Sequence, residues 1–331
     1  MRDRKTGLAV SLLLVVLLQL YLGMSFVVIQ PGAAIDLARI VHTPLGETPR
    51  QGAFLLTAVS SQRANLLTAL LALARPDTDL IPTRHELPQG MDLQGYLELM
   101  ERMMEESKMV AQAVALRQAG YQVRVENLVR VEQVLPISPA RGLLEPGDLL
   151  IAIDGHPIAT IDELKMRLQD RSVGDEVALL VVRDGEFREI LVPTVGESQT
   201  SELPALQIIV GPDLEYDLPM EITIDAGNIK GSSAGLMFAL EILDQLRAGK
   251  LTGGRKIAGT GSLTLEGKVE AVGGVRQKVI AAGRAGAEYF LVPLANAAEA
   301  RSVSGPMQVV AVEHIDDAIR FLQKIAGAQA S

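Results

Sequence analysis

The stretch of sequence that decides the fold is GSSAGLMFALEILDQLRAG, from residue 231 to residue 249. Apolar residues recur in it every three or four positions, which is the spacing of one face of an α-helix. That face is formed by Leu236, Ala239, Leu240, Leu243 and Leu246. The pattern predicts a helix that buries one face and ends at Gly249. It also places Ser232 and Ser233 in the loop that leads into the helix.

Strand and helix patterns alternate on both sides of this helix. Just before this helix, strands are expected at 206–210 and 220–224. After it, strands are expected at 257–265, 269–272, 289–292 and 308–312, and helices at 275–285 and 316–325. Near the N-terminus, a strand is expected at 53–59 and helices at 64–74 and 92–119. Both outer parts of the chain are therefore predicted to mix α and β elements.

Residues 121–196 show a different pattern. Short strands are expected at 128–134, 148–153, 176–182 and 187–192, and a short helix at 161–168. Turns are expected at the Asp-Gly pairs 154–155 and 184–185, because this dipeptide favours tight hairpins. The segment is typical of a small separate β domain. This agrees with a chain of 331 residues, a length that suggests two folded units.

Composition excludes several classes of function. The net charge of −9 gives no reason to expect nucleic acid as a partner, and 3% aromatic residues are too few for a base-stacking platform. The chain has no cysteine and four histidines without metal-ligand spacing, so no metal or other cofactor is expected. No G-x-x-x-x-G-K-[ST] motif occurs, so no nucleotide partner is expected either.

Residues 8–29 contain no charged side chain, and a helix rises about 1.5 Å per residue, so this segment is long enough to span a bilayer. Arg2, Arg4 and Lys5 precede it. The positive-inside rule then predicts a single-pass protein of the cell membrane, with a cytoplasmic N-terminus and extracytoplasmic bulk. The alternative is a cleaved signal peptide, for which residues 32–34 (GAA) offer a small-residue cleavage site.

Ser233 is the first candidate for chemistry, and two activation schemes remain open from the residues alone. Read as G-x-S-x-G, residues 231–235 fit the nucleophile elbow of an α/β-hydrolase, with His314 as the base. Read with a lysine base, Lys278 fits, because it shares the apolar stripe of its helix with Val275 and Ala282. A buried lysine has a lowered pKa. The other explanation of Lys278 is a surface lysine that extends its ammonium to water.

The central segment resembles the PDZ family. The resemblance is carried by SPARGLLEPGDLLIAIDG at residues 138–155. It implies a domain that binds an extended peptide or protein segment as an added strand. The groove is expected between the strand at 128–134 and the helix at 161–168. The alternative is a domain that only spaces or packs the other parts.

The flanking segments resemble the proteolytic domain of the Lon family of serine peptidases. Ser233-Ala234-Gly235 is similar to the nucleophile motif of that family, and GTGSLTLEGKVEAVGGVRQK at 259–278 is similar to its second block. The resemblance implies a Ser233–Lys278 dyad in which Thr260 orients the lysine. The backbone N–H groups of Ser232 and Ser233 are expected to hold the oxyanion. Two positions depart from the family pattern: Ser232 stands in place of a proline and Lys230 in place of an acid.

The resemblance extends to residues 54–59 and to the helix around residues 104–107, so the peptidase fold is expected to be split by the PDZ-like segment. The expected fold class is α+β: an N-terminal transmembrane helix and a Lon-type domain of the ribosomal S5 domain 2-like fold with an inserted PDZ-like domain. The expected parts are a tail at 1–7, the membrane helix at 8–29, a linker at 30–50, the first part of the peptidase at 51–119, the PDZ domain at 120–196, the rest of the peptidase at 197–326 and a tail at 327–331.

The layout resembles the membrane-anchored PDZ-containing Lon-like peptidases of Gram-positive bacteria. It implies an ATP-independent serine endopeptidase that cleaves extracytoplasmic proteins or peptides, with the PDZ domain capturing substrate or gating access. The chain is compatible with a homo-oligomer. The alternative is a catalytically silent, membrane-anchored PDZ adaptor.

Overall fold

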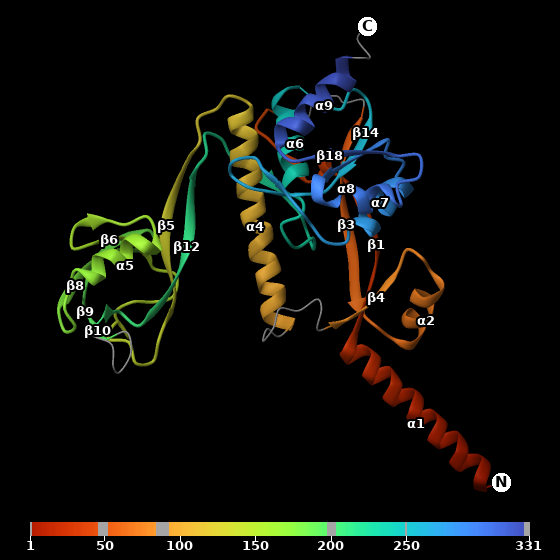
Figure 1. Cartoon of the computed structure of the whole chain (residues 1–331), viewed down its shortest axis with the longest axis horizontal. Coiled ribbons are helices and arrows are strands. Elements are labelled where there is room, and N and C mark those ends of the chain that lie inside the picture. Colours follow the sequence, from red (N-terminus) through yellow and green to blue (C-terminus); the bar gives the residue numbers. More distant parts are fainter. Residues whose placement is uncertain (1, 46–51, 84–92, 197–202, 249, 328–331) are drawn as a thin grey trace. The chain divides into compact units, whose positions relative to one another are not determined.

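The computed structural model describes residues 2–45, 52–83, 93–196, 203–248 and 250–327. The chain forms two units (Figure 1). The first joins Met1–Gln122 to Leu218–Ser331, and the second is Val123–Asp217. Residues on either side of the second unit therefore fold together.

The first unit is built on a mixed sheet in the order β18-β17-β14-β3-β1-β4. Its strands are β1 (Phe26–Asp36), β3 (Ala53–Arg63), β4 (Asp79–Pro82), β14 (Lys256–Gly259), β17 (Tyr289–Pro293) and β18 (Gln308–Val312). β14 runs parallel to both β3 and β17, whereas β1 is antiparallel to β3 and β4. The β3–β14 pairing joins the two chain segments that flank the second unit.

Three helices carry the site: α6 (Gly235–Leu246) and α7 (Val275–Arg284), which pack on this sheet, and α4 (Leu93–Gln118), which packs on α6. Phe54, Leu55 and Leu56 are all buried, so both faces of β3 are covered. Leu55 packs in a core with Val275 and Val279 of α7. Helix α6 also contacts β3, and α4 packs against α6. The apolar stripe expected on the helix after Ser233 is thereby buried.

The smaller elements of the first unit complete it. They are η1 (Leu37–Arg39), β2 (Val41–His42), α2 (Leu66–Ala74), β13 (Thr223–Ile224), β15 (Ser262–Leu263), β16 (Val269–Glu270), η2 (Leu294–Asn296), α8 (Ala297–Arg301) and α9 (Ile315–Gly327). β13 pairs with β2, and β15 pairs with β16.

The predicted membrane helix at 8–29 is wrong. Helix α1 (Arg2–Ser25) ends at Ser25, and the next residues form β1, in which Val27 pairs with Arg63 of β3 and Ile81 of β4. Val28 is 1% exposed, so the apolar end of the predicted span is buried in the protein core. Among the described residues, no helix combines the length and the apolarity needed to cross a bilayer. This finding overturns the transmembrane part of the expected fold class and the predicted single-pass topology.

The predicted linker at 30–50 also differs from the structure. Its first residues continue β1, with Gln30 opposite Ser60 of β3, and η1 and β2 follow. Leu37 and Val41 are fully buried. Proline and glycine in this stretch suggested an irregular segment, but the pairing with β3 accommodates Pro31 at a point where the register shifts.

The second unit is a sheet in the order β12-β5-β6-β8-β9, with β7 paired to β6. Its elements are β5 (Arg124–Val134), β6 (Leu149–Ile153), β7 (His156–Pro157), α5 (Ile161–Gln169), β8 (Glu176–Arg183), β9 (Glu186–Pro193), β10 (Val195–Gly196), β11 (Pro204–Ala205) and β12 (Ile208–Asp217). Val129, Leu150, Leu164 and Leu179 pack in its core. β12 lies at one edge, antiparallel to β5 along its whole length.

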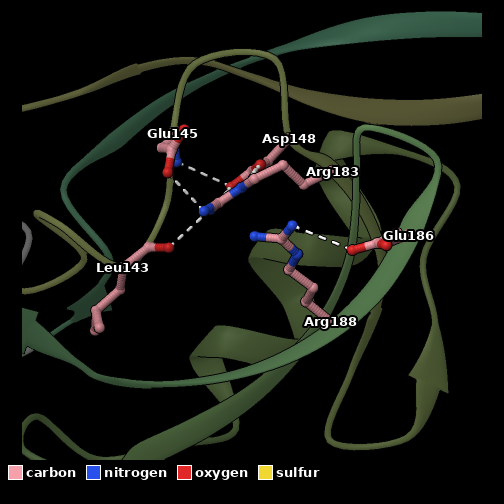
Figure 2. A network of polar contacts seen from close by, with 6 residues as sticks. All are labelled: Leu143, Glu145, Asp148, Arg183, Glu186 and Arg188. Carbon is pink, nitrogen blue, oxygen red and sulfur yellow. Dashed lines mark hydrogen bonds and ion pairs between the residues drawn. The ribbon is translucent and has the colours of Figure 1, made fainter.

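A polar network fixes the loop before β6 in the second unit (Figure 2). The guanidinium of Arg183 donates to both carboxylate oxygens of Asp148, at 2.6 and 2.7 Å, and to Leu143 O at 2.8 Å. It also forms an ion pair with Glu145. Asp148 is 1% exposed, and a buried carboxylate is stable only with such partners. The nearby ion pair between Arg188 and Glu186 is exposed.

Candidate active site

Ser233 lies in the turn between β13 and α6. Ala234 is the N-cap residue of α6 and forms no side-chain cap, so the helix starts directly after Ser233. The first amides of a helix have no partner within the helix, and they give its N-terminus a partial positive charge. The sequence therefore places the hydroxyl of Ser233 beside a region that favours negative charge.

Lys278 reaches this turn from α7. Its Nζ donates to Ser233 Oγ at 2.8 Å and to Thr260 Oγ1 at 3.0 Å. The N-cap residue of α7 is Gly274, whose φ of 68° is left-handed. A Cβ at this position would lie 2.7 Å from Val59 Cγ1, so glycine allows α7 to approach β3 closely. The close approach sets the position from which Lys278 extends to Ser233.

The side chain of Lys278 is enclosed, because the residue is only 3% exposed. Burial lowers the pKa of its ammonium from 10.5 to about 8. An ammonium in such a place loses hydration, which disfavours the charged form. Near neutral pH a useful fraction of Lys278 is therefore a neutral amine, which is able to accept a proton.

Thr260 is hydrogen-bonded to both Lys278 and Ser233. Its hydroxyl accepts the hydrogen bond from Lys278 and donates to Ser233 O at 3.0 Å. Gly261 N also donates to Ser233 O, at 2.9 Å, and Leu236 N donates to Gly261 O. The residues after β14 are thus hydrogen-bonded to Ser233 and to the first turn of α6. Thr260 is fully buried, so water does not compete for these bonds.

Helix α4 holds the other side of the turn. Ser107 Oγ donates to Ser232 O at 3.0 Å, and Gly231 N donates to Met100 O at 2.8 Å. Gly231 has a φ of 89°, and a Cβ there would collide with the side chain of Met100. The left-handed backbone favours glycine at this position, whereas the flexible end of Met100 is able to move aside. The sequence pattern predicted the helix at 92–119 but did not single out Met100 as part of the site.

The two positions that depart from the Lon pattern have partners in the structure. The hydroxyls of Ser232 and Ser262 share a hydrogen bond of 2.7 Å. Lys230 forms an ion pair with Glu101 of α4. Each side chain therefore ties the loop before Ser233 to a neighbouring element, a restraint that proline or an acid would not supply.

The amides of the turn are available to a ligand. In the part of the chain that the structure describes, neither Ser232 N nor Ser233 N donates a hydrogen bond to the protein. Donors that stand ready beside a nucleophile stabilise charge that develops on a carbonyl oxygen.

The structure does not bring the residues of the hydrolase alternative together. His314 contacts Glu266 O through Nε2, at 2.6 Å, and Asp316 through Nδ1, at 3.2 Å. Ser233 instead contacts Lys278. The described residues contain no cluster of acidic or histidine side chains suited to a metal ion.

A second candidate site lies in the second unit, and it differs from the predicted groove between 128–134 and α5. A cavity of about 320 Å³ lies between α5 and the segment that leads into β12. It is lined by Ile161, Leu164 and Leu168 on one side and by Leu203, Ile208 and Val210 on the other. β12 covers the edge of β5, so β12 and not β5 borders the cavity. The sequence predicted a strand at 206–210, and in the structure residues 208–217 form β12 of the second unit.

Comparisons with known proteins match both parts of the chain. A family model of the Lon protease (S16) C-terminal proteolytic domain matches residues 211–324, and a model of the PDZ domain matches residues 114–194. The Lon protease of Clostridioides difficile (strain 630) is 37% identical over 116 residues, which are 33% of this chain and 14% of that protein. Lon protease 1 of Syntrophobacter fumaroxidans is 31% identical over 142 residues, 38% of this chain and 17% of that protein. The chain thus spans less than a fifth of the length of these relatives.

Solved structures similar to this chain include PDZ domains. That of an SdrC-like protein from Listeria monocytogenes is 23% identical, covers 25% of this chain and 85% of its own, and has a TM-score of 0.24. That of an SdrC-like protein from Listeria innocua is 25% identical, covers 25% of this chain and 92% of its own, and has the same TM-score of 0.24.

The family matches confirm the two domains recognised in the sequence. The chain contains a Lon-type proteolytic domain and a PDZ domain. The relatives that match the first of these domains are Lon proteases.

Proposed function

We propose that this protein is an ATP-independent serine endopeptidase that uses Ser233 as nucleophile and Lys278 as general base. The observation that carries the proposal is the 2.8 Å contact between Ser233 Oγ and a buried Lys278 whose pKa is lowered to about 8. A base with a pKa near the working pH removes a hydroxyl proton effectively. No phosphate-binding G-x-x-x-x-G-K-[ST] motif occurs in the 331 residues, so cleavage by this chain is proposed to need no nucleotide.

The proposed reaction has two halves. Neutral Lys278 takes the hydroxyl proton as Ser233 Oγ bonds to the scissile carbonyl carbon, and Lys278 then gives this proton to the leaving amine as the C–N bond breaks. A water molecule next attacks the acyl ester and transfers a proton to Lys278. The ester C–O bond breaks, and Ser233 Oγ recovers the proton while the carboxylic acid leaves.

Thr260 is proposed as a positioning residue, and the amides of Ser232 and Ser233 as the oxyanion donors. The Thr260 hydroxyl contacts Lys278 Nζ and Ser233 O, so it is able to fix the lysine relative to the nucleophile. The two amides have no acceptor among the described residues and stand at the start of α6. Backbone donors in this position lower the energy of the tetrahedral intermediate.

We also propose that residues 51–119 belong to the peptidase domain. The support is β3, which pairs with β14, and α4, which is hydrogen-bonded to the turn that carries Ser233. The PDZ domain is proposed to capture a peptide segment in the cavity between α5 and β12. An edge strand beside an apolar cavity is suited to adding a peptide as a further strand.

The test is labelling with a serine-directed fluorophosphonate combined with cleavage of an unfolded protein substrate. We expect wild type to be labelled at Ser233 and to cleave without ATP, Ser233→Ala to do neither, and Ser304→Ala, a matched control, to do both. A folded wild type that binds peptides but is neither labelled nor active would contradict the proposal and favour a PDZ adaptor.

A further inference from the structure

Two serine side chains outside the proposed dyad hold the residue directly before Ser233. Ser107 Oγ of α4 donates to Ser232 O at 3.0 Å. Ser262 Oγ of β15 shares a hydrogen bond of 2.7 Å with Ser232 Oγ. The main chain and the side chain of Ser232 are therefore each fixed by a different element of the first unit. The proposed mechanism assigns no role to either of these two serines.

The hydroxyl of Ser107 bonds outside its own helix. A serine within a helix commonly points to water or donates to a carbonyl of the preceding turn. Ser107 is only 6% exposed, and its hydroxyl donates to the turn that carries Ser233. This hydroxyl therefore stabilises the turn rather than α4.

Gly235, the first residue of α6, allows both neighbouring elements to come close to the turn. A Cβ at this position would lie 3.0 Å from Ser107 Oγ and 3.2 Å from the Cβ of Leu263, which follows Ser262 in β15. Both distances are shorter than ordinary van der Waals contact. Glycine thus lets α4 and β15 pack against the start of the helix, where their serines reach Ser232.

The carbonyl of Ser232 and the amide of Ser233 belong to one peptide group. The peptide bonds of the described residues are trans, and a trans peptide is planar with its C=O and N–H in opposite directions. Ser107 fixes the direction of Ser232 O, so it also fixes the direction of the Ser233 N–H, which points away from α4. Gly235 N donates to the same carbonyl over a longer distance of 3.3 Å.

We infer that Ser107 and Ser262 are positioning residues that act through Ser232 and direct the N–H of Ser233 at the oxyanion of the reaction. The inference rests on the proposed peptidase function and deepens it. A donor whose direction is fixed before the reaction stabilises the developing charge without reorganisation. The charge develops only in the transition state, so loss of either hydroxyl lowers kcat and leaves substrate binding unchanged.

Steady-state kinetics and the rate of fluorophosphonate labelling test the inference on the full chain. Outright removal of an oxyanion donor lowers kcat by about 10²–10³, and a donor that remains but is free to turn has a smaller effect. We expect Ser107→Ala and Ser262→Ala each to lower kcat and the labelling rate about tenfold, with KM within about twofold of wild type. Ser262→Thr keeps the hydroxyl in a residue suited to a strand and is expected to recover most of the activity. Ser302→Ala removes a hydroxyl that donates to Glu299 O at the end of α8, and this matched control keeps the wild-type kcat.

Urea unfolding of each variant gives the folded fraction under the assay conditions. The inference is wrong if folded Ser107→Ala and Ser262→Ala keep the wild-type kcat, if KM changes in place of kcat, or if Ser262→Thr is as impaired as Ser262→Ala. It is also wrong if the losses only follow the folded fraction. If wild type itself is neither labelled nor active, the peptidase proposal fails and the inference fails with it. Should Ser107→Ala not fold, the two variants of Ser262, a half-buried residue, decide by the same criteria.

Discussion

Ser107 Oγ donates a hydrogen bond of 3.0 Å to Ser232 O, although 125 positions of sequence and the whole second unit separate the two residues. The bond joins α4 to the residue directly before the proposed nucleophile. The loop of Ser233 is thus held by a helix that precedes the PDZ domain.

The first prediction follows from this bond. Arg124 and Asp217 are paired neighbours, so the two ends of the second unit lie side by side. A short Gly/Ser bridge between them adds little loop entropy. We expect a chain with residues 123–217 replaced by such a bridge to unfold cooperatively and to be labelled by fluorophosphonate at Ser233.

The matched comparison is the fragment 218–331, which lacks α4 and β3. It exposes the apolar faces that these elements cover, and we expect it to aggregate and to resist labelling. Cooperative unfolding and labelling of this fragment alone would show that the first part of the chain is not required for the peptidase fold.

The second prediction concerns pH. The proposed base Lys278 accepts a proton only when it is neutral, and its pKa is about 8, so kcat/KM is expected to rise about tenfold per pH unit below pH 8 and to level off above it. The measurement is the initial rate of peptide cleavage between pH 6 and pH 10. A flat profile across this range excludes Lys278 as the titrating base.

The third prediction concerns stability. The pKa of Lys278 is about 8 in the folded chain and 10.5 as a free side chain, so the unfolded state binds more protons between these values and stability rises with pH there. Below pH 8 the buried ammonium costs about 3 kcal/mol. Lys278→Met is expected to raise the free energy of unfolding at pH 7 by up to this amount. Above about pH 10.5 the difference from wild type is expected to disappear. Urea unfolding at both pH values measures it, and equal differences at both would contradict the burial argument.

The fourth prediction separates a positioning role of Thr260 from a structural one. Thr260→Val keeps the shape but removes the hydroxyl that contacts Lys278 and Ser233 O. Loss of hydrogen bonds of this kind corresponds to an activity loss of about 10- to 100-fold in kcat/KM. Thr260→Ser restores the hydroxyl and is expected to recover most of the activity. If Val and Ser variants are equally impaired at unchanged stability, the hydroxyl is not the important group.

The fifth prediction concerns the second unit. Arg183→Met leaves the carboxylate of Asp148 buried without its main partner, and removal of one member of a buried pair costs about 3–5 kcal/mol. Arg188→Met removes an exposed pair, for which the expected change is below about 1 kcal/mol. Thermal unfolding of the two variants compares residues that lie close together in Figure 2. Similar losses in both would mean that the Asp148 network is not important for stability.

The sequence predicted much of the first unit because its helices have clear apolar faces. The helix after Ser233 was expected from its stripe and observed as α6. Lys278 was placed on the apolar side of its helix, and its burial agrees with this. The contact between Ser233 and Lys278 was expected only from the resemblance, because helix spacing does not show which surfaces meet across 45 positions.

Two errors have physical causes. A continuous apolar run is compatible with a membrane helix and with a buried strand, and only the pairing of residues 26–29 with β3 and β4 decides between them. The groove was expected beside β5, whereas the cavity borders β12, which follows the PDZ pattern in sequence but pairs with β5 at the edge of its sheet. Local patterns predict a strand without identifying its neighbour.

The pairing of β3 with β14 has a consequence for the order of events during synthesis. Leu56 is made 203 residues before its partner Gly259, since 259 − 56 = 203. At ribosomal rates of roughly 5–20 residues per second, this edge of β3 waits about 10–40 s for its neighbour. In that interval the second unit is completed first, while Phe54 and Leu56 have no cover from β14 or α6. The nascent chain therefore exposes the apolar residues of β3 well before Ser233 is made, and the proposed Ser233–Lys278 pair is complete only when the last third of the chain has emerged.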